Sequence, residues 1–299
     1  MIWKKSVEIY KKILLFFYAY GIMMLNYKKR KEVNTMKRVL YLAMALVMCL
    51  GLAACGSQNN DPAATNTPSA SNNKTYVIYS DNSFAPFEFM DEASGEYIGV
   101  DMDILAAVAA DQGFSYSVKN EGFKAAMGAV QSGQADGMIA GMTINDERKA
   151  TFDFSDGYFE DGQVLTVAKD SDIKTEEDLK GKTIAAKNGT MGLQYAESIK
   201  DKYGFTISYY EDSPSMYQAI INGVNDACFE DFSVIGWAIQ SENVALKTVG
   251  DVINPAQYGF AVKKSENAEL LELFNKGLEN IKANGKYDEI LNKYGYGDK

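Results

Sequence analysis

Apolar positions after residue 74 follow two alternating periods. Short runs of β-favouring residues, Thr75–Tyr79 and Phe114–Val118, alternate with Val100–Ala110 and Phe123–Gln131, in which apolar residues recur at helical spacing. Another short apolar run follows at Gly137–Ala140. Strands interleaved with helices in this way predict βαβ units, and therefore an α/β fold with a mixed sheet.

A second set of the same kind follows and is large enough to form its own lobe. Its expected strands are Val164–Val167, Thr183–Ala186, Thr206–Tyr210 and Ala227–Glu230. Its expected helices open at Thr175 with a capping-box pattern and then cover Gly192–Lys202, Ser213–Asn222, with Ser213 as N-cap, and Phe232–Ser241. The chain closes with a strand at Gly259–Val262 and amphipathic helices at Asn267–Asn284 and Tyr287–Tyr294.

The N-terminal part has the pattern of an export signal. A basic Met36–Arg38 precedes the apolar run Val39–Leu52, which is long enough for a signal peptide but short for a membrane span. The run ends in small residues before Cys55, which resembles the lipobox of bacterial lipoproteins and implies that Cys55 is lipidated. A diacylglyceryl group carries two acyl chains, enough for stable anchoring at the outer face of the cell membrane.

These signals divide the N-terminal part into three segments. We expect residues 1–35 to be an upstream extension, with translation beginning at Met36; the alternative is a cytoplasmic or membrane segment around Ile13–Leu25. Residues 36–54 are the expected signal peptide. Residues 55–73 hold the lipidated Cys and a flexible tether, because Ser, Asn, Thr, Pro and Asp dominate there.

Charge and composition exclude several classes of function. Of 299 residues, 30 are basic and 40 acidic; ten of the basic but only two of the acidic residues precede Cys55, so the rest carries 20 against 38. Such an acidic protein would repel the phosphate backbone, so we do not expect it to bind nucleic acid. The sequence has no histidine, which excludes Ser-His-Asp and Cys-His catalytic systems and every metal site that contains histidine. Cys228 is the one Cys of the expected body, so a Cys-rich zinc site is excluded there as well, and we expect no metal site and no cofactor. Cys228 is expected as a small buried residue on a strand.

Ordered motifs across residues 74–297 resemble the polar amino-acid family of bacterial periplasmic-type solute-binding proteins. The motifs are Ser83–Phe89 (SFAPFEF), Gly99–Leu105 (GVDMDIL), Gly141–Lys149 (GMTINDERK), Phe152–Tyr158 (FDFSDGY), Lys187–Thr190 (KNGT) and Glu230–Asp231. The glutamine-binding branch is the most similar in appearance. The resemblance implies a receptor that gives its ligand to the permease of an ABC importer, and we expect a monomer.

The resemblance also implies the architecture. The expected fold is the two-lobed, type II periplasmic-binding-protein-like fold, in which two crossover strands join the lobes and the ligand lies between them. The crossovers would lie near Tyr158–Gln163 and Asn254–Tyr258. Lobe 1 then comprises residues 74–160 plus 257–299, and lobe 2 comprises residues 163–255. Hinge closure about such crossovers buries a ligand.

The family's positions for a zwitterionic ligand fall on residues suited to it. A dehydrated amino acid needs a planar pair of donors for its carboxylate and an anion for its ammonium group. Arg148 and Asp231 stand at these positions. Thr143, Thr190 and the backbone at Ala140 and Gly141 would supply the remaining hydrogen bonds.

Other positions would contact the ligand's side chain. Phe84 and Phe123 match aromatic positions that enclose the aliphatic stem. Asp81, Lys187 and Glu230 match positions around the end of the ligand's side chain. Asp81 is an acceptor and Lys187 a donor, a pairing that suits an uncharged amide and favours glutamine. Met191 stands where relatives usually have a small residue. Glu230 adds an acid that could instead favour cystine, arginine or lysine.

Two other classes of function remain open at this point. Cyclohexadienyl dehydratases share this fold, and Glu230 or Glu88 would then act as general acid. The sequence shows no nucleophile–base pair, so we expect no catalysis. A sensory lobe that reports amino-acid levels to a membrane partner is the third possibility.

Overall fold

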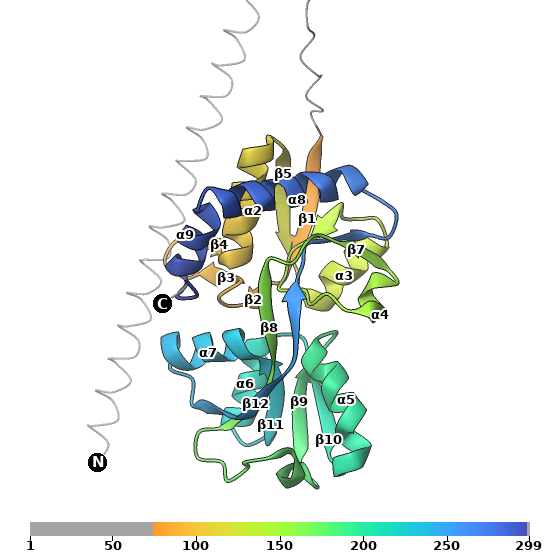
Figure 1. Ribbon diagram of the computed structural model, residues 1–299. Helices are drawn as coiled ribbons and strands as arrows, with labels where there is room; N and C mark the ends of the chain where they lie inside the picture. Colours follow the sequence, from red (N-terminus) through yellow and green to blue (C-terminus); the bar gives the residue numbers. More distant parts are fainter. Residues whose placement is uncertain (1–73, 298–299) are drawn as a thin grey trace, which may run out of the picture. The chain divides into compact units, whose positions relative to one another are not determined.

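The computed structural model describes residues 74–297, which contain two five-stranded mixed sheets (Figure 1). The expected signal peptide, tether and lipidated Cys55 lie outside these residues. The first sheet has the order β5-β1-β6-β13-β7, and the second has the order β10-β9-β11-β8-β12. We call the first sheet with its helices the first lobe, and the second sheet with its helices the second lobe.

The first lobe is built from two segments far apart in the sequence. Its strands are β1 (Thr75–Ser80), β5 (Ser115–Asn120), β6 (Gly137–Met138), β7 (Phe152–Phe154) and β13 (Ala261–Lys263). Its helices are α2 (Val100–Gln112), α3 (Phe123–Gln131), α4 (Asp146–Lys149), α8 (Ala268–Ala283) and α9 (Lys286–Lys293). A small sheet, β2 (Ser83–Phe84), β3 (Glu88–Asp91) and β4 (Glu96–Ile98), adjoins it.

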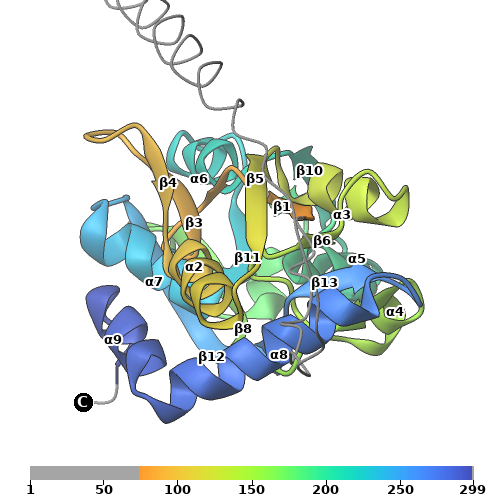
Figure 2. The ribbon, with the colours of Figure 1, turned by 90° about the horizontal axis from the view of Figure 1, so that it is seen from above.

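Alternation along β1 explains why helices cover both faces of the first sheet. Tyr76 and Ile78 pack in a cluster with residues of α2 and α8, whereas Tyr79 packs in a second cluster with residues of α3. Seen from above, α2 and α8 lie on one side of the strands and α3 on the other (Figure 2).

The second lobe repeats this layering. Its strands are β8 (Phe159–Ala168), β9 (Thr183–Lys187), β10 (Thr206–Tyr210), β11 (Ala227–Asp231) and β12 (Leu246–Tyr258). Its helices are the 3-10 turn η1 (Glu176–Leu179), α5 (Met191–Tyr203), α6 (Ser213–Ile221) and α7 (Phe232–Ser241). Residues of α6 and α7 pack in one core cluster and residues of α5 in another. Cys228 lies fully buried on β11, as the sequence predicts.

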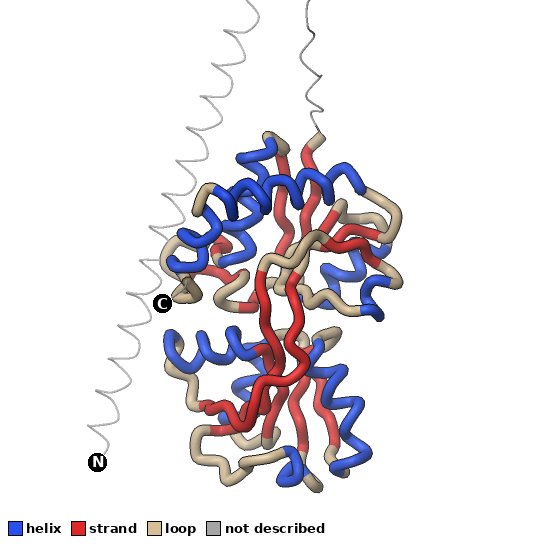
Figure 3. The backbone as a smooth tube through the Cα atoms, viewed as in Figure 1, coloured by secondary structure: helices blue, strands red, loops and turns tan. Residues whose placement is uncertain are grey.

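Two long antiparallel strands, β8 and β12, run between the lobes (Figures 1 and 3). Their paired stretch at the lobe boundary includes Phe159 with Tyr258 and Asp161 with Ala256. Two register shifts interrupt the ladder between Val249 and Ala256. Within residues 74–297, no helix is long and apolar enough to cross a membrane.

Candidate ligand-binding site

A narrow cavity lies where loops of both lobes meet. The lining residues follow strand ends or open helices, and they are Asp81, Phe84, Phe123, Ala140, Gly141, Thr143, Arg148, Lys187, Thr190, Met191 and Asp231. Eleven of the twelve residues predicted to bind ligand therefore surround one space, and Glu230 is not among them.

Strand direction explains this convergence. In the first lobe β1 and β6 are parallel, so Asp81 and Ala140, which follow their carboxyl ends, meet at one edge of the sheet. In the second lobe β9 and β11 are parallel and end at Lys187 and Asp231. Ligands of open α/β sheets commonly bind at such edges.

Arg148 is held in place by the short helix α4. Asn145 caps this helix, and its side-chain oxygen accepts the Arg148 N–H at 2.7 Å. The guanidinium donates from Nη1 to the Thr143 carbonyl at 2.8 Å and from Nη2 to the Gly189 carbonyl of the second lobe at 3.0 Å. These bonds use two of its five N–H groups.

Burial affects the charge of Arg148 only modestly. Loss of hydration lowers the pKa of Arg148 to about 10, and the negative charge of Asp231 opposes the shift. The guanidinium carbon lies 5.3 Å from the centre of the Phe123 ring, a further favourable contact for a cation. Arg148 is therefore cationic at neutral pH.

The loop after β6 lines one wall of the cavity with Ala140 and Gly141. Gly141 has φ +51°, and a Cβ placed there would lie 2.6 Å from the Phe84 ring. Glycine is required at this point because the backbone is left-handed and the ring leaves no room. The Gly141 N–H donates to Asp101 Oδ2 at 2.7 Å, which fixes the loop against α2.

Asp231 opens α7 but forms no side-chain capping bond there. Its carboxylate accepts instead from Gln163 Nε2 at 2.9 Å and from the Tyr258 hydroxyl at 2.5 Å. Burial raises the pKa of Asp231, whereas these two donors and the charge of Arg148 counteract that rise. The side chain faces the cavity as an oriented anion.

A second acid, Asp161, lies on the crossover strand β8 next to Asp231. Tyr258 OH also lies 3.3 Å from Asp161 Oδ2, so one hydroxyl is shared between two carboxylates. Burial, followed by the charge of Asp231, raises the pKa of Asp161 to about 7. Asp161, Tyr258 and Gln163 were not predicted from the sequence; their positions on the expected crossover strands were the one available signal.

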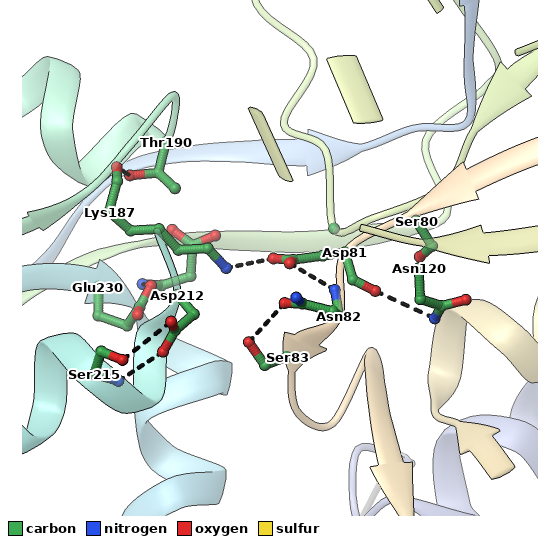
Figure 4. A network of polar contacts seen from close by, with 12 residues as sticks. Ser80, Asp81, Asn82, Ser83, Asn120, Lys187, Thr190, Asp212, Ser215 and Glu230 are labelled. Atoms are coloured by element: carbon green, nitrogen blue, oxygen red, sulfur yellow. Dashed lines mark hydrogen bonds and ion pairs between the residues drawn. The ribbon is translucent and has the colours of Figure 1, made fainter. Parts of the chain in front are cut away.

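Asp81 and Lys187 form an ion pair that joins the two lobes (Figure 4). Their side chains are 1% and 2% exposed, so the pair is shielded from water. Asp81 also accepts the Asn82 N–H at 2.7 Å, and Lys187 Nζ lies 4.8 Å from the centre of the Phe84 ring. The pair supplies one acceptor and one donor at the same wall of the cavity.

The first turn of α5 forms the remaining wall. Thr190 caps the helix by accepting the Leu193 N–H at 3.3 Å and donates to the Lys187 carbonyl at 2.9 Å. The neighbouring Met191 sulfur accepts from Asn145 Nδ2 at 3.0 Å. These contacts and the bond from Arg148 to Gly189 bring the lobes together around the cavity.

Glu230 lies behind the cavity wall. Its carboxylate accepts from the Tyr217 hydroxyl at 2.9 Å and from the Asp231 N–H at 3.0 Å. Burial and the charge of Asp231 raise the pKa of Glu230 to about 7. Glu88 is likewise buried and does not line the cavity. No cluster of potential metal ligands occurs in the described part of the chain.

Comparison with known proteins gives a consistent result. The family model described as "Bacterial extracellular solute-binding proteins, family 3" matches residues 76–297. A "Probable histidine-binding protein" of Neisseria gonorrhoeae is 32% identical, over 85% of this chain and 94% of its own length. The "ABC transporter glutamine-binding protein GlnH" of Bacillus subtilis (strain 168) is also 32% identical, over 87% of this chain and 97% of its own length.

A solved structure agrees with the sequence comparisons. An ancestral arginine-binding protein, solved bound to arginine and bound to glutamine, is 38% identical with a TM-score of 0.69, over 74% of this chain and 98% of its own. The type II periplasmic-binding-protein fold expected from the sequence is confirmed by this likeness.

Proposed function

The chain belongs to family 3 of the bacterial extracellular solute-binding proteins, and from this premise we propose that it captures glutamine outside the cytoplasm and delivers it to an ABC permease. In this proposal, ligand binding favours closure of the two lobes about β8 and β12. The permease then recognises the closed, loaded form.

One observation carries the proposal: Arg148 from the first lobe and Asp231 from the second line the same buried cavity. An amino acid carries its carboxylate and its ammonium group on the same carbon atom, so it can interact with both residues at once. Each end of the ligand loses water on closure, and an ionised partner that is already oriented compensates for that loss.

The remaining lining supports a zwitterion with a short polar side chain. Phe84 and Phe123 offer apolar surface to the aliphatic stem. Thr143 also lines the cavity, and in this proposal its hydroxyl group completes the hydrogen bonds to the ligand. The charged side chains that line the cavity are buried, which strengthens each charged contact.

The ion pair of Asp81 and Lys187 favours an uncharged amide over a charged side chain. A carboxamide has one acceptor and one donor group, so its oxygen can interact with Lys187 and its NH2 with Asp81. A cationic side chain would face Lys187, and an anionic one would face Asp81, so each would meet like charge. One relative is named for glutamine, whereas others are named for histidine or arginine.

A basic amino acid is the second candidate, and the acids near Asp231 favour it. Glu230 and Asp161 are buried beside Asp231 and add negative charge that a cationic ligand would offset. A relative is named an arginine-binding extracellular protein. The cationic side chain of arginine or lysine would meet the like charge of Lys187, which the amide of glutamine does not.

Binding without turnover is part of the proposal. A dehydratase needs a general acid that reaches the substrate. Neither Glu88 nor Glu230, the two carboxyl groups considered for this role, lines the cavity. Incubation with prephenate or arogenate, followed by chromatography, tests for turnover, and product formation at a rate above that of buffer would contradict this part.

The test of the ligand is calorimetric titration of the purified protein with each of the common amino acids. We expect glutamine to bind most tightly and to raise the melting temperature most, because a ligand bound only by the folded state stabilises it. Arg148→Ala and Asp231→Ala should each abolish this stabilisation while the unliganded protein still folds. Lys149→Ala, which alters an exposed neighbour, is the matched control. Normal binding by either site variant would refute the assigned role.

We also propose that Cys55 anchors the protein to the outer face of the membrane. The support is the apolar run and the small residues that precede it. Detergent phase separation of cells that express the full chain should recover the protein in the detergent phase. Cys55→Ser should move it to the aqueous phase, and an unchanged distribution would refute the anchor.

A further inference from the structure

Two carboxyl groups, Glu88 and Asp101, lie together in the interior of the first lobe without enough donors. The Asp101 N–H donates to the carbonyl of Phe87 at 2.9 Å, which places α2 directly against the residue before Glu88. Both side chains are fully buried. Among the described residues, both oxygens of Glu88 and Oδ1 of Asp101 have no hydrogen-bond partner, although each is buried.

The other oxygen of Asp101, Oδ2, accepts two hydrogen bonds. Asp101 Oδ2 accepts the Gly141 N–H at 2.7 Å and the Tyr158 hydroxyl at 2.9 Å. Gly141 belongs to the cavity wall, and Tyr158 immediately precedes the crossover strand β8. Asp101 thus connects the ligand-binding loop with the hinge, and these two donors require it to act as an acceptor.

Within residues 74–297, no cation forms an ion pair with Glu88 or Asp101. The charged or titratable groups that face Glu88 are Asp101 from α2, Asp81 after β1 and Lys187 at the end of β9. Lys187 is paired with Asp81. Two adjacent carboxylates in an interior cannot both be ionised without large cost, and a proton between them removes one charge and supplies the missing donor.

We propose that Glu88 is protonated at neutral pH and donates its hydroxyl hydrogen to Asp101 Oδ1, so that an acid–carboxylate pair positions the Gly141 loop at the ligand cavity. Glu88 is then a positioning residue that acts through Asp101. Burial raises the pKa of Glu88 well above its usual value, and the charge of Asp101 raises it further, which agrees with this geometry. Asp101 remains the ionised member because it has the donors.

The proposal makes a proton-counting prediction that needs no ligand. If Glu88 is protonated in the folded protein and ionised in the unfolded chain, folding retains one proton at this site. Glu88→Gln has no such proton and its amide can donate to Asp101 in the same way. We divide the unfolding equilibrium constant of wild type by that of Glu88→Gln. This ratio should grow about tenfold per pH unit between about pH 5.5 and 7.5, because only wild type releases the Glu88 proton on unfolding.

Urea unfolding at several pH values measures this ratio. Glu96→Gln, an exposed acid of the adjacent strand β4, is the matched control and should give a ratio that stays constant with pH. Infrared difference spectra in D2O provide the second readout: Glu88→Gln should lose the C=O stretch intensity of one protonated carboxylic acid relative to wild type, while Asp161 and Glu230 contribute equally to both spectra. A pH-independent ratio for Glu88→Gln, or an unchanged infrared band, would overturn the protonated state.

Hydrogen exchange at the Gly141 amide tests the positioning role. Glu88→Leu has a similar volume but no donor, and we expect exchange at Gly141 to be at least tenfold faster than in wild type. Glu88→Gln should keep exchange within about threefold of wild type. Equal protection in all three proteins would overturn the positioning role, and Glu88→Gln keeps the protonation test valid if Glu88→Leu does not fold.

Discussion

Replacement of Lys187 with methionine should convert the cavity from an amide site to a site for a cationic side chain. Methionine preserves much of the aliphatic length of lysine but removes the charge that faces Asp81. The Asp81 carboxylate would then be buried with the Asn82 N–H as its remaining donor among the described residues. A guanidinium group from arginine could replace the missing cation and form two parallel bonds.

The size of the effect follows from the burial of the pair. Removal of one partner from a buried ion pair costs about 3–5 kcal/mol because the other charge is left uncompensated. At ~2–4 °C per kcal/mol for a domain of this size, the melting temperature of unliganded Lys187→Met should fall by the order of 10 °C. Asp81→Asn/Lys187→Met, which removes both charges, should recover most of that loss.

Melting curves and calorimetry with glutamine and with arginine measure the outcome. We expect arginine to stabilise Lys187→Met more than glutamine does, and to lose that advantage in the double variant, which has no Asp81 carboxylate. The reasoning is refuted if Lys187→Met keeps the melting temperature and the ligand preference of wild type. It is equally refuted if the double variant binds arginine as tightly as the single variant.

Three further predictions concern residues around the same cavity. Burial raises the pKa of Asp161 to about 7, so the stabilising contribution of its protonated form is complete below about pH 4 and is lost as the pH rises through 7. Urea unfolding should show that Asp161→Asn gains stability relative to wild type as the pH rises from 4 to 7. A difference in unfolding free energy that does not change with pH would contradict the raised pKa of Asp161. Gly141→Ala should destabilise the protein by about 1–3 kcal/mol and weaken ligand binding in calorimetry, because its backbone has φ +51° and the added Cβ meets Phe84; unaltered affinity would show that the loop can move. Asn145→Ala should cost about 1 kcal/mol through loss of the α4 cap and weaken binding through Arg148, and melting curves with and without glutamine separate the two effects.

Periodicity predicted the fold where elements are long and failed where they are short. The structure has α2 and α5 within two residues of the expected helices. The sheet of β2, β3 and β4 was missed because strands of two to four residues hardly show a period. The N-cap of α6 is Asp212 rather than the expected Ser213: the Asp212 carboxylate accepts the Ser215 N–H at 2.7 Å, a bond that two adjacent polar residues cannot reveal by sequence alone.

The charged residues of the site were available from motifs, but their surroundings were not. Resemblance pointed to Arg148 and Asp231, and the structure shows both at one cavity. It could not show that the Tyr258 hydroxyl lies between the carboxylates of Asp161 and Asp231, because these residues belong to three different strands. Ligand contact by Arg148 and Asp231 stays a prediction, as does a role in binding for Glu230, which does not line the cavity.

Closure has an energetic component that does not depend on the ligand. The ion pair from Lys187 to Asp81 and the bond from Arg148 to Gly189 join the lobes, and both would be lost on opening. A ligand shifts the balance between open and closed forms only by the difference in its affinity for the two. An amide that inserts between Lys187 and Asp81 weakens one direct contact while it adds two of its own. Affinity for glutamine should therefore reflect the difference between these contacts, and residues that tune the pair without touching the ligand should change affinity without changing which amino acid is preferred.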